Sequence, residues 1–403
     1  GDRYAMHDLI RAYAATTVRR ALPEQARQAA LERLVDFYRH TAHEAAQLLN
    51  AGHPPVRLAP AAGSHPHLLR DRSAATAWLD THRPHLPAAQ RTAAALGHHD
   101  VVWHLAWAAS KFFRQRGHRH DDLTAWQSAV DAAAHLPDPT AGILAHRLLG
   151  FAHANLDRHE QAAAHLRRAL TLAEHHHDCL QQAHTHYVLS RAAERRGDLA
   201  PALEHACRAL TLYRDLGEPL REAVTLNVVG WYTARLGDHD AARELCRTAL
   251  GLHRRHHNTE GEAYSLDALG YIEHQAGHHR EAIDHYQQAI PLFREIGNAA
   301  EVAHNLDNLG HPQTALGLRS HARASWQEAL ELYRRQGRTT EVDRVQQQLD
   351  ALAGEQLAAL EVLGAGRLGA TLAHLRQAGT QLVDELPHLC CAHRHLRRRP
   401  RRC

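Results

Sequence analysis

Side chains suited to holding a peptide recur every 40 residues in the middle of the chain. One column of such positions contains Arg147, Tyr187, Asn227, Asp267 and Asp307. A second contains Phe151, Arg191, Trp231, Tyr271 and His311, and a third contains Asn155, Arg195, Arg235 and Gln275. Arg pairs with carboxylates through two hydrogen bonds, Asn bonds peptide backbones, and aromatic rings add contact area at low entropic cost. We therefore expect these columns to line a groove that binds a protein or an extended peptide.

The charge along this predicted groove changes sign. Arg residues lie in the early copies, whereas Asp267 and Asp307 lie in the late ones. We therefore expect a bound segment to place its acidic part near the early copies. The alternative is a solvated helix face whose aromatic residues only pack between repeats, and the sequence leaves both interpretations open.

Catalytic motifs are not recognisable in the sequence. It contains no G-x-S-x-G, no H-E-x-x-H and no Gly-rich dinucleotide loop after a strand. A phosphate-binding P-loop needs a Gly-rich turn followed by Lys, but the only lysine, Lys111, lies between Ser110 and Phe112. We expect no enzymatic activity and no cofactor in this chain, with ADP or ATP bound only by a nucleotide-binding domain upstream of it.

Histidine and cysteine are numerous, but their spacing does not predict a metal site. The runs His175–His177, His256–His257 and His278–His279 fall at expected turns or helix ends. Zinc needs four converging ligands, which adjacent histidines in a turn do not supply. We expect no metal there, nor at the terminal group of Cys390, Cys391, His393 and His395.

Composition restricts the class of protein further. The formal net charge of +3 is too small to imply a nucleic-acid partner by itself. No apolar run reaches 18 residues, and the N-terminus lacks the pattern of a signal peptide. We therefore expect a cytoplasmic chain that makes no contact with a membrane.

The elements that would position the columns form an internal repeat from about residue 141 to 340. A small-residue column contains Gly150, Ser190, Gly230, Gly270 and Gly310, and another contains Ala162, Ala202, Ala242, Ala282 and Ala322. Turns are expected near Asp157, Gly197, Gly237, Gly277 and Gly317. Each copy is thus a helix pair, 141–156 with 159–174 in the first. Because one pair cannot bury its apolar face, the pattern predicts an all-α, right-handed solenoid of stacked helix hairpins.

The repeat resembles the tetratricopeptide (TPR) family. Leu149, Gly150, Ala162, Leu166 and Ala169 fall at the spacings of that family's L-G, A, F and A signature. The chain departs from the family in its longer period and in lacking the Pro that closes the second helix. It is similar in this respect to the long-repeat TPRs of bacterial regulators.

The N-terminal segment RYAMHDLIRAYA resembles the end of the winged-helix part of NB-ARC-type STAND ATPases. Their M-H-D motif corresponds to Met6, His7 and Asp8, and the resemblance implies a nucleotide-sensing role for His7 with Asp8. Residues 74–97 look like the linker helices of actinobacterial antibiotic-regulatory STAND proteins. The alternative for Asp8 is an ordinary helix start, where a carboxylate is favoured by the helix dipole.

We predict four segments: residues 1–20 as the winged-helix remnant, 21–100 as a helical linker, 101–352 as the TPR solenoid, and 353–403 as a helical or disordered tail. The solenoid would comprise one degenerate copy, five clear copies and a capping helix. The resemblance implies the sensor region of a STAND-type transcriptional regulator, in which partner binding controls an intramolecular NB-ARC module. DNA would be contacted only through domains outside this chain.

Two alternatives are a self-standing TPR scaffold or peptide receptor without an ATPase, and nucleic-acid binding through the basic tail at 388–403.

Overall fold

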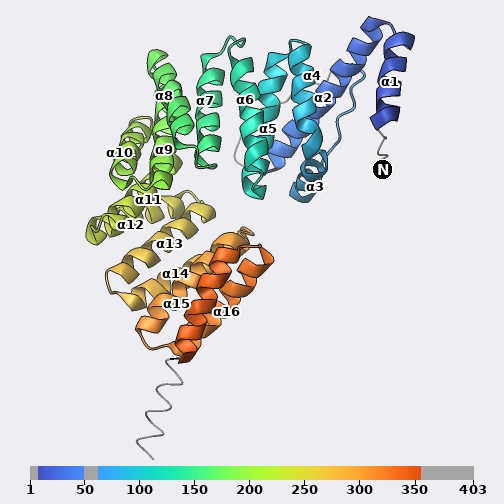
Figure 1. The fold of residues 1–403 in the computed structure, drawn as a ribbon. Helices are drawn as coiled ribbons and strands as arrows, with labels where there is room; N and C mark the ends of the chain where they lie inside the picture. Colours follow the sequence, from blue (N-terminus) through green and yellow to red (C-terminus); the bar gives the residue numbers. More distant parts are fainter. Residues whose placement is uncertain (1–7, 50–61, 355–403) are drawn as a thin grey trace, which may run out of the picture. The chain divides into compact units, whose positions relative to one another are not determined.

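The computed structural model describes residues 8–49 and 62–354, and these residues form helices joined by short turns (Figure 1). The first helices are α1 (Asp8–Ala21), α2 (Glu24–Leu49), α3 (Arg72–His82), the 3-10 helix η1 (Arg83–His85) and α4 (Leu86–Ala95). The repeat helices are α5 (His99–Arg116), α6 (Arg119–Ala133), α7 (Pro139–Ala154), α8 (His159–His175), α9 (Cys179–Arg196), α10 (Leu199–Asp215), α11 (Pro219–Arg235), α12 (His239–Arg255), α13 (Thr259–Gln275), α14 (His279–Glu295), α15 (Ala299–Ala315) and α16 (Arg319–Arg335). Residues 339–354 are also helical, and no strand occurs within the described ranges. The predicted all-α fold of repeated helix pairs is confirmed.

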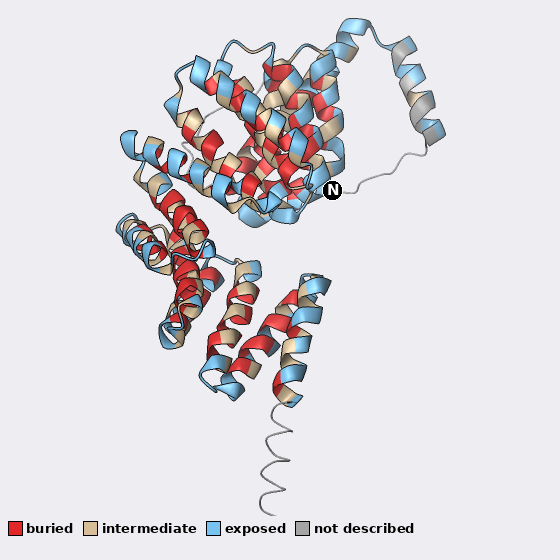
Figure 2. Ribbon diagram, turned by 60° about the vertical axis from the view of Figure 1, so that its left-hand side comes forward, coloured by how far each residue is buried: buried red, intermediate tan, exposed pale blue. Residues whose placement is uncertain are grey.

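The chain divides into two compact units, Gly1–Gly261 and Glu262–Cys403. In the first unit, α5 packs on α6, α7 on α8, α9 on α10 and α11 on α12, and each pair also packs on the next. In the second unit, α14 packs on α15 and α15 on α16. In each unit, buried residues lie along the helix sides that face one another (Figure 2). The division falls inside the predicted 101–352 segment, and the four-part partition of the chain stays a prediction.

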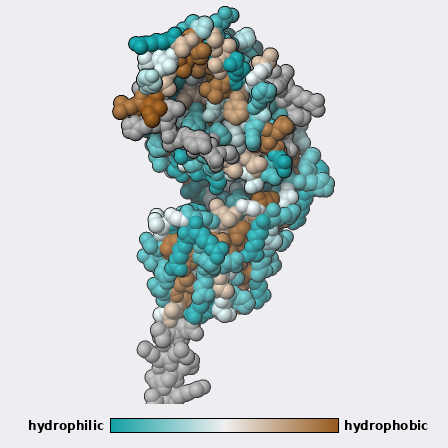
Figure 3. All heavy atoms as spheres, turned by 90° about the vertical axis from the view of Figure 1, so that its right-hand side faces the viewer, coloured by the Kyte–Doolittle hydropathy of each residue, from teal (hydrophilic) through white to brown (hydrophobic). Residues whose placement is uncertain are grey.

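The surface is consistent with helices whose apolar sides face one another. On the face drawn in Figure 3, hydrophilic side chains predominate and hydrophobic ones gather in small separate groups. Figure 3 thus shows the polar outer side that amphipathic helices present when their apolar stripes are covered.

Both kinds of turn between helices use a residue with positive φ. After the first helix of a pair, the predicted turn residues Asp157, Gly197, Gly237, Gly277 and Gly317 all have φ between 57° and 100°. After the second helix, the equivalent residues are His177, Gly217, His257, Gly297 and Gly337, with φ between 51° and 72°. A residue in this left-handed conformation ends the helix and satisfies its last carbonyl groups. Two of the histidine runs therefore lie at helix C-termini, as predicted.

Close contact between the two helices of a pair is set by the small-residue column. A Cβ atom at Gly150 would lie 2.7 Å from Leu166 Cγ, and one at Gly270 would lie 2.7 Å from Tyr286 Cε1. At Gly310 the side chain in the way is Trp326. Ser190 replaces Gly in the copy where the opposing residue is Ala206, and both are fully buried. The size of one residue therefore compensates for the size of the other.

We predict that Gly230→Ala lowers the stability of the fold by about 1–3 kcal/mol, because overpacking of a tight core costs that much. The new Cβ would lie 2.5 Å from Cys246 Sγ and 3.1 Å from the Ala242 carbonyl oxygen. Gly251→Ala, in the partner helix with no atom within 4 Å of its Cβ, should instead stabilise by about 0.5–1 kcal/mol. Urea unfolding followed by circular dichroism measures both.

Urea unfolding of the same variants in a Cys246→Ala background tests whether a smaller residue at position 246 compensates for a larger one at position 230. In that background the cost of Gly230→Ala should shrink, since the pair then imitates Ser190 with Ala206. Equal costs of Gly230→Ala with and without Cys246→Ala would contradict the proposed contact.

Histidine pairs join the two helices in two successive copies. His146 on α7 and His165 on α8 bring their Nδ1 atoms to 3.0 Å, and His186 on α9 and His205 on α10 do the same. Burial, followed by the charge of the second imidazole of each pair, lowers the pKa of His146 to about 4 and that of His186 to about 4. Burial also lowers the pKa of His165 and His205. Each pair thus requires neutral rings, one donating a proton to the other.

We predict that the first unit loses stability as the pH falls from 6.5 towards 4. The folded pKa values lie below the ordinary value of 6.5, so the unfolded chain binds more protons in this window. The charged neighbours are Arg168 at the first pair and Arg208 with Glu204 at the second.

In the next copy, the equivalent positions are Leu226 and Leu245, which pack in the core. A variant with Leu at all four His positions should therefore lose part of the difference between unfolding midpoints at pH 7 and pH 4.5. An unchanged difference would show that the pairs do not cause it.

Candidate partner-binding site

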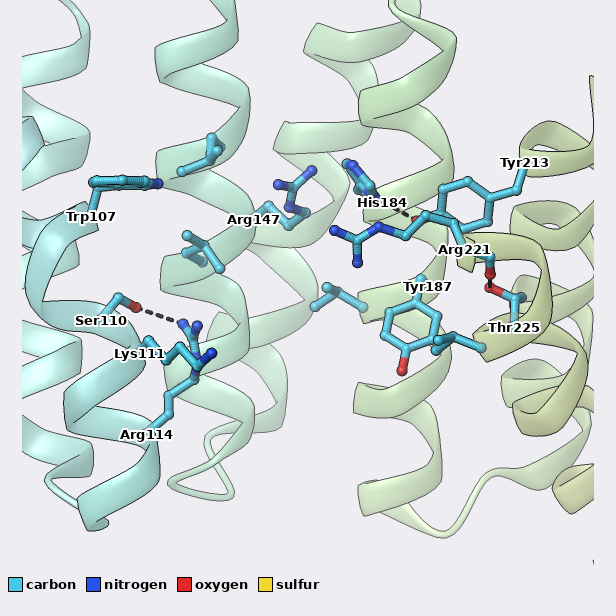
Figure 4. Close-up of a pocket in the computed structure, with 14 residues that line it drawn as sticks. Trp107, Ser110, Lys111, Arg114, Arg147, His184, Tyr187, Tyr213, Arg221 and Thr225 are labelled. Carbon is cyan, nitrogen blue, oxygen red and sulfur yellow. Dashed lines mark hydrogen bonds between the residues drawn. The ribbon is translucent and has the colours of Figure 1, made fainter. Parts of the chain in front are cut away.

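A pocket of 330 Å³ lies on the first helices of four successive pairs in the first unit (Figure 4). It is lined by Trp107, Ser110, Lys111 and Arg114 of α5, Leu144, Arg147 and Leu148 of α7, His184, Tyr187 and Val188 of α9, Tyr213 of α10, and Arg221, Val224 and Thr225 of α11. Two predicted groove residues of the first column, Arg147 and Tyr187, therefore share one pocket.

The repeat explains why these side chains meet. Trp107, Arg147 and Tyr187 are spaced by 40 residues, so each occupies the same position in its own first helix. Stacked pairs of equal geometry present such positions side by side. Because the small-residue column sets the same close contact in each pair, the first helices of these copies have similar rotations about their axes.

The pocket is positively charged. Its lining contains Lys111, Arg114, Arg147 and Arg221 but neither Asp nor Glu. Arg147 is only 7% exposed, and its Nη1 donates to Gln181 Oε1 at 2.5 Å. Burial lowers the pKa of Arg147 to about 10, which still leaves the guanidinium charged at neutral pH. Figure 4 shows the side chains of Arg147 and Arg221 directed towards the same space.

A neutral polar pair lies beside these cations. His184 Nδ1 is 2.5 Å from the hydroxyl oxygen of Tyr213. Burial, followed by the charges of Arg147 and Arg221, lowers the pKa of His184 to about 3. Burial raises the pKa of Tyr213 to about 12. The imidazole is therefore uncharged and the phenol protonated at neutral pH, so this pair adds hydrogen-bonding capacity without adding charge.

A second cluster, which we call the Glu194 cluster, gathers predicted groove residues around one carboxylate. Glu194 is 16% exposed and pairs with Arg191 at 3.1 Å and with Arg235 at 3.4 Å. Trp231 Nε1 donates to Glu194 Oε1 at 3.0 Å, and the Tyr232 hydroxyl donates to Oε2 at 3.2 Å. The chain itself thus supplies the anion that these Arg and aromatic side chains bind.

Other predicted residues of the first unit lie around these two sites. Phe151 and Asn155 line a neighbouring pocket of 240 Å³ together with Arg114, Arg119 and Asp122. Arg195 Nε donates to the Ala154 carbonyl oxygen at 3.0 Å. Asn227 is half-buried on α11.

In the second unit, Asp267 and Tyr271 are half-buried on α13, and Asp307 is buried on α15. The Asp307 carboxylate accepts a hydrogen bond from Arg344 at 2.6 Å and one from the Tyr333 hydroxyl at 3.4 Å. Burial raises the pKa of Asp267 to about 7. The part of the groove predicted at these residues stays a prediction.

The residues predicted to sense a nucleotide, His7 and Asp8, lie at the edge of the described chain. His7 falls outside the described residues, and Asp8 is the first residue of α1. The terminal group of Cys390, Cys391, His393 and His395 also lies outside them. Within residues 8–49 and 62–354 no group of three or more His, Cys, Asp or Glu side chains is arranged to hold a metal ion.

Several residues of these sites are not among those predicted from the sequence. Extending the first two columns by one period into the degenerate copy reaches Trp107 and Lys111, so the repeat itself contained that signal. Arg221 lies in the first turn of α11, and the column through Glu194 has Ala154 and Ala234 as its neighbours. Neither position carries a repeated residue type that would mark it.

Comparison with known proteins identifies the repeat. The tetratricopeptide repeat family model matches residues 141–215 and 221–295. This part of the chain therefore consists of TPR repeats, a protein-binding type of repeat, as predicted. No helix in the described part of the chain is long and apolar enough to cross a membrane.

One relative and two solved structures show where similar sequences and folds occur. Regulatory protein AfsR of Streptomyces griseus is 31% identical over 201 residues, which make up 49% of this chain and 20% of that protein. The chain thus matches about a fifth of the length of this relative. A STAND protein with a tetratricopeptide repeat sensor from Pyrococcus horikoshii is 13% identical, with 71% of this chain and 53% of that chain covered and a TM-score of 0.49. A Rap protein complexed with competence and sporulation factor is 13% identical, with 70% and 84% covered and a TM-score of 0.49.

Proposed function

We propose that this chain, whose residues 141–215 and 221–295 are TPR repeats, binds a protein or peptide partner in the pocket on α5, α7, α9 and α11. We propose further that this binding controls a nucleotide-binding module joined to the chain before α1. In this function the chain performs no chemistry, and its role is to couple occupancy of the pocket to the state of the module.

The observation that carries the first part is the composition of the pocket. Aromatic rings of Trp107 and Tyr187, aliphatic side chains and four cations converge on 330 Å³ of space. Pockets with apolar walls and a few convergent polar groups are the usual form of ligand sites. The first helices of successive pairs supply nearly all of the lining, so an extended partner would contact several copies at once.

The support for the second part comes from the N-terminal segment. The Met6-His7-Asp8 motif resembles the end of the winged-helix part of NB-ARC-type ATPases, and α1 begins at Asp8 of this motif. Leu9, Ile10 and Tyr13 on α1 are 75%, 57% and 74% exposed. A domain packed against α1 would bury these side chains, and large apolar groups left in water favour such a contact. The similarity to a regulatory protein of Streptomyces griseus agrees with a regulatory role.

Binding is tested with a phage-displayed library of random peptides selected on the complete chain. We expect Trp107→Ala with Tyr187→Ala to weaken binding of the selected peptides by about tenfold or more, since buried aromatic anchors dominate such interfaces. Fluorescence anisotropy with labelled peptides gives the Kd values, and circular dichroism checks that the variant is folded.

The control removes apolar area elsewhere. Leu216→Ala with Leu236→Ala changes two exposed side chains at helix C-termini outside the pocket, which are 41% and 50% exposed. This variant should bind as the unchanged chain does. Failure to select any peptide, or equal binding by the aromatic variant, would overturn the assignment of the pocket.

The regulatory part is tested on the gene. The coding sequence upstream of Gly1 should contain, in frame, a P-loop with its Gly-rich turn followed by Lys and Ser or Thr. A stop codon followed by a start site close to Gly1 would contradict this part and favour the self-standing TPR scaffold. The peptide-binding test above holds in either case.

A further inference from the structure

We propose that the pocket selects a peptide segment carrying Asp or Glu side chains next to aliphatic residues, with Lys111, Arg147 and Arg221 as the cations that recognise the carboxylates. This inference rests on the proposed binding function and adds the chemical class of the partner. It concerns the pocket residues defined above and not the Glu194 cluster, where a carboxylate of the chain is already bound.

The cations of the pocket lack the partners that Arg residues have elsewhere in the chain. Within the described residues, neither Lys111 nor Arg147 nor Arg221 forms an ion pair with a carboxylate, and the guanidinium of Arg147 bonds a neutral amide. By contrast, Arg214 pairs with Glu222 at 2.8 Å and Arg208 with Glu204 at 2.6 Å. Cations gathered without counter-charge repel one another, so an anion entering the pocket relieves that repulsion as well as forming new bonds.

The charged groups around the pocket agree with this assignment. Asp122 is bonded to the pocket residue Ser110, whose hydroxyl donates to Asp122 Oδ1 at 2.9 Å. The same hydroxyl accepts a hydrogen bond from Arg114 at 2.6 Å. Arg114 is therefore held at one side through Ser110, and burial raises the pKa of Asp122 to about 6. Glu260 acts on Lys111 through its charge but forms no ion pair with it. His184 is neutral and bonded to Tyr213. Asp178 likewise acts on Arg147 through its charge. Within the described residues, none of these carboxylates forms an ion pair with Lys111, Arg147 or Arg221.

The apolar part of the lining narrows the class of anion. Leu144, Leu148, Val188 and Val224 belong to the same pocket as the cations. Aliphatic walls offer no hydrogen bonds to a fully hydrated ion, and they gain free energy only by covering apolar surface of a ligand. A free inorganic anion would contact only the cations of this pocket. A peptide that alternates acidic and aliphatic side chains would contact both the cations and the apolar walls.

The location also agrees with the charge pattern of the sequence. The predicted groove is most basic in its early copies, where we expect the acidic part of the partner to lie. The pocket is formed by the degenerate copy and the first three clear copies, which is that end of the repeat.

The probe for the experiment is a fluorescently labelled, end-blocked peptide of sequence Leu-Glu-Leu-Glu-Leu, and its matched probe has Gln in place of Glu. Both ends are blocked so that the termini carry no charge, and both probes carry the same dye, so that they differ in charge only at the Glu or Gln side chains. Fluorescence anisotropy measures the Kd of both peptides for the complete chain at low and high salt, and inorganic phosphate is added as a competitor in a separate arm.

We expect the Glu peptide to bind about tenfold or more tightly than the Gln peptide, since hydrogen bonds to charged groups are about twice as strong as neutral ones. Raising the salt should weaken only the Glu peptide. Phosphate should compete poorly, because it does not cover the apolar walls.

The variants Lys111→Gln and Arg221→Gln should each weaken the Glu peptide several-fold and leave the Gln peptide unchanged. Arg208→Gln, which removes the same charge from an exposed ion pair on α10, is the matched control and should have no effect. Arg147 is left unchanged because it is buried and its replacement endangers the fold. Circular dichroism checks each variant for its helical signal.

Three outcomes would overturn the inference. These are equal affinities for the Glu and Gln peptides, an unchanged Kd in the variant with both Lys111→Gln and Arg221→Gln, and complete displacement of the Glu peptide by phosphate at the peptide's own Kd. If the library of the preceding section selects peptides without acidic residues, the binding function stands while this inference fails. If no library peptide binds, the binding function fails with it.

Discussion

The helices of each pair approach one another so closely that one column of the first helix must remain small. Gly faces Leu166, Cys246, Tyr286 or Trp326 in four of the copies, and Ser190 faces Ala206 in the fifth. Because a protein interior is packed to nearly crystalline density, an added methyl group at such a contact has nowhere to go. This contact fixes the rotation of each first helix about its own axis. Because each copy of the first unit is held in the same way, residues 40 positions apart become neighbours along the pocket.

Much of this arrangement could be predicted from the sequence, because the same contacts recur in register. The helix pairs, the turn residues with positive φ and the small-residue column all repeat, so one copy supports the interpretation of the next. The predicted helices 141–156 and 159–174 correspond to α7 (Pro139–Ala154) and α8 (His159–His175). The residues that repeat are those that every copy needs in order to fold.

The binding residues were harder to predict, because a site differs from one copy to the next. Arg147 and Tyr187 were found through their column, and Trp107 and Lys111 belong to the same two columns one period earlier. Glu194 was missed since Ala occupies its column in both adjacent copies. Only the structure shows that Arg191, Trp231 and Arg235 converge on that carboxylate. The periodic pattern predicts where a surface lies, whereas its chemistry depends on residues that break the pattern.

The two basic sites of the first unit differ in whether the chain itself supplies a carboxylate to the cations. Around Glu194, guanidinium groups and an indole N–H already hold a carboxylate of the chain. The pocket of Lys111, Arg147 and Arg221 has similar side chains without such a carboxylate. The pocket also spans α5 to α11, so a ligand that contacts Lys111 and Arg221 at once ties the first of these four helix pairs to the last. A stack of repeats bends at the joints between copies. Such a ligand would restrain bending at several joints at once. Ionic contacts a few ångströms wide would then make the first unit as a whole more rigid.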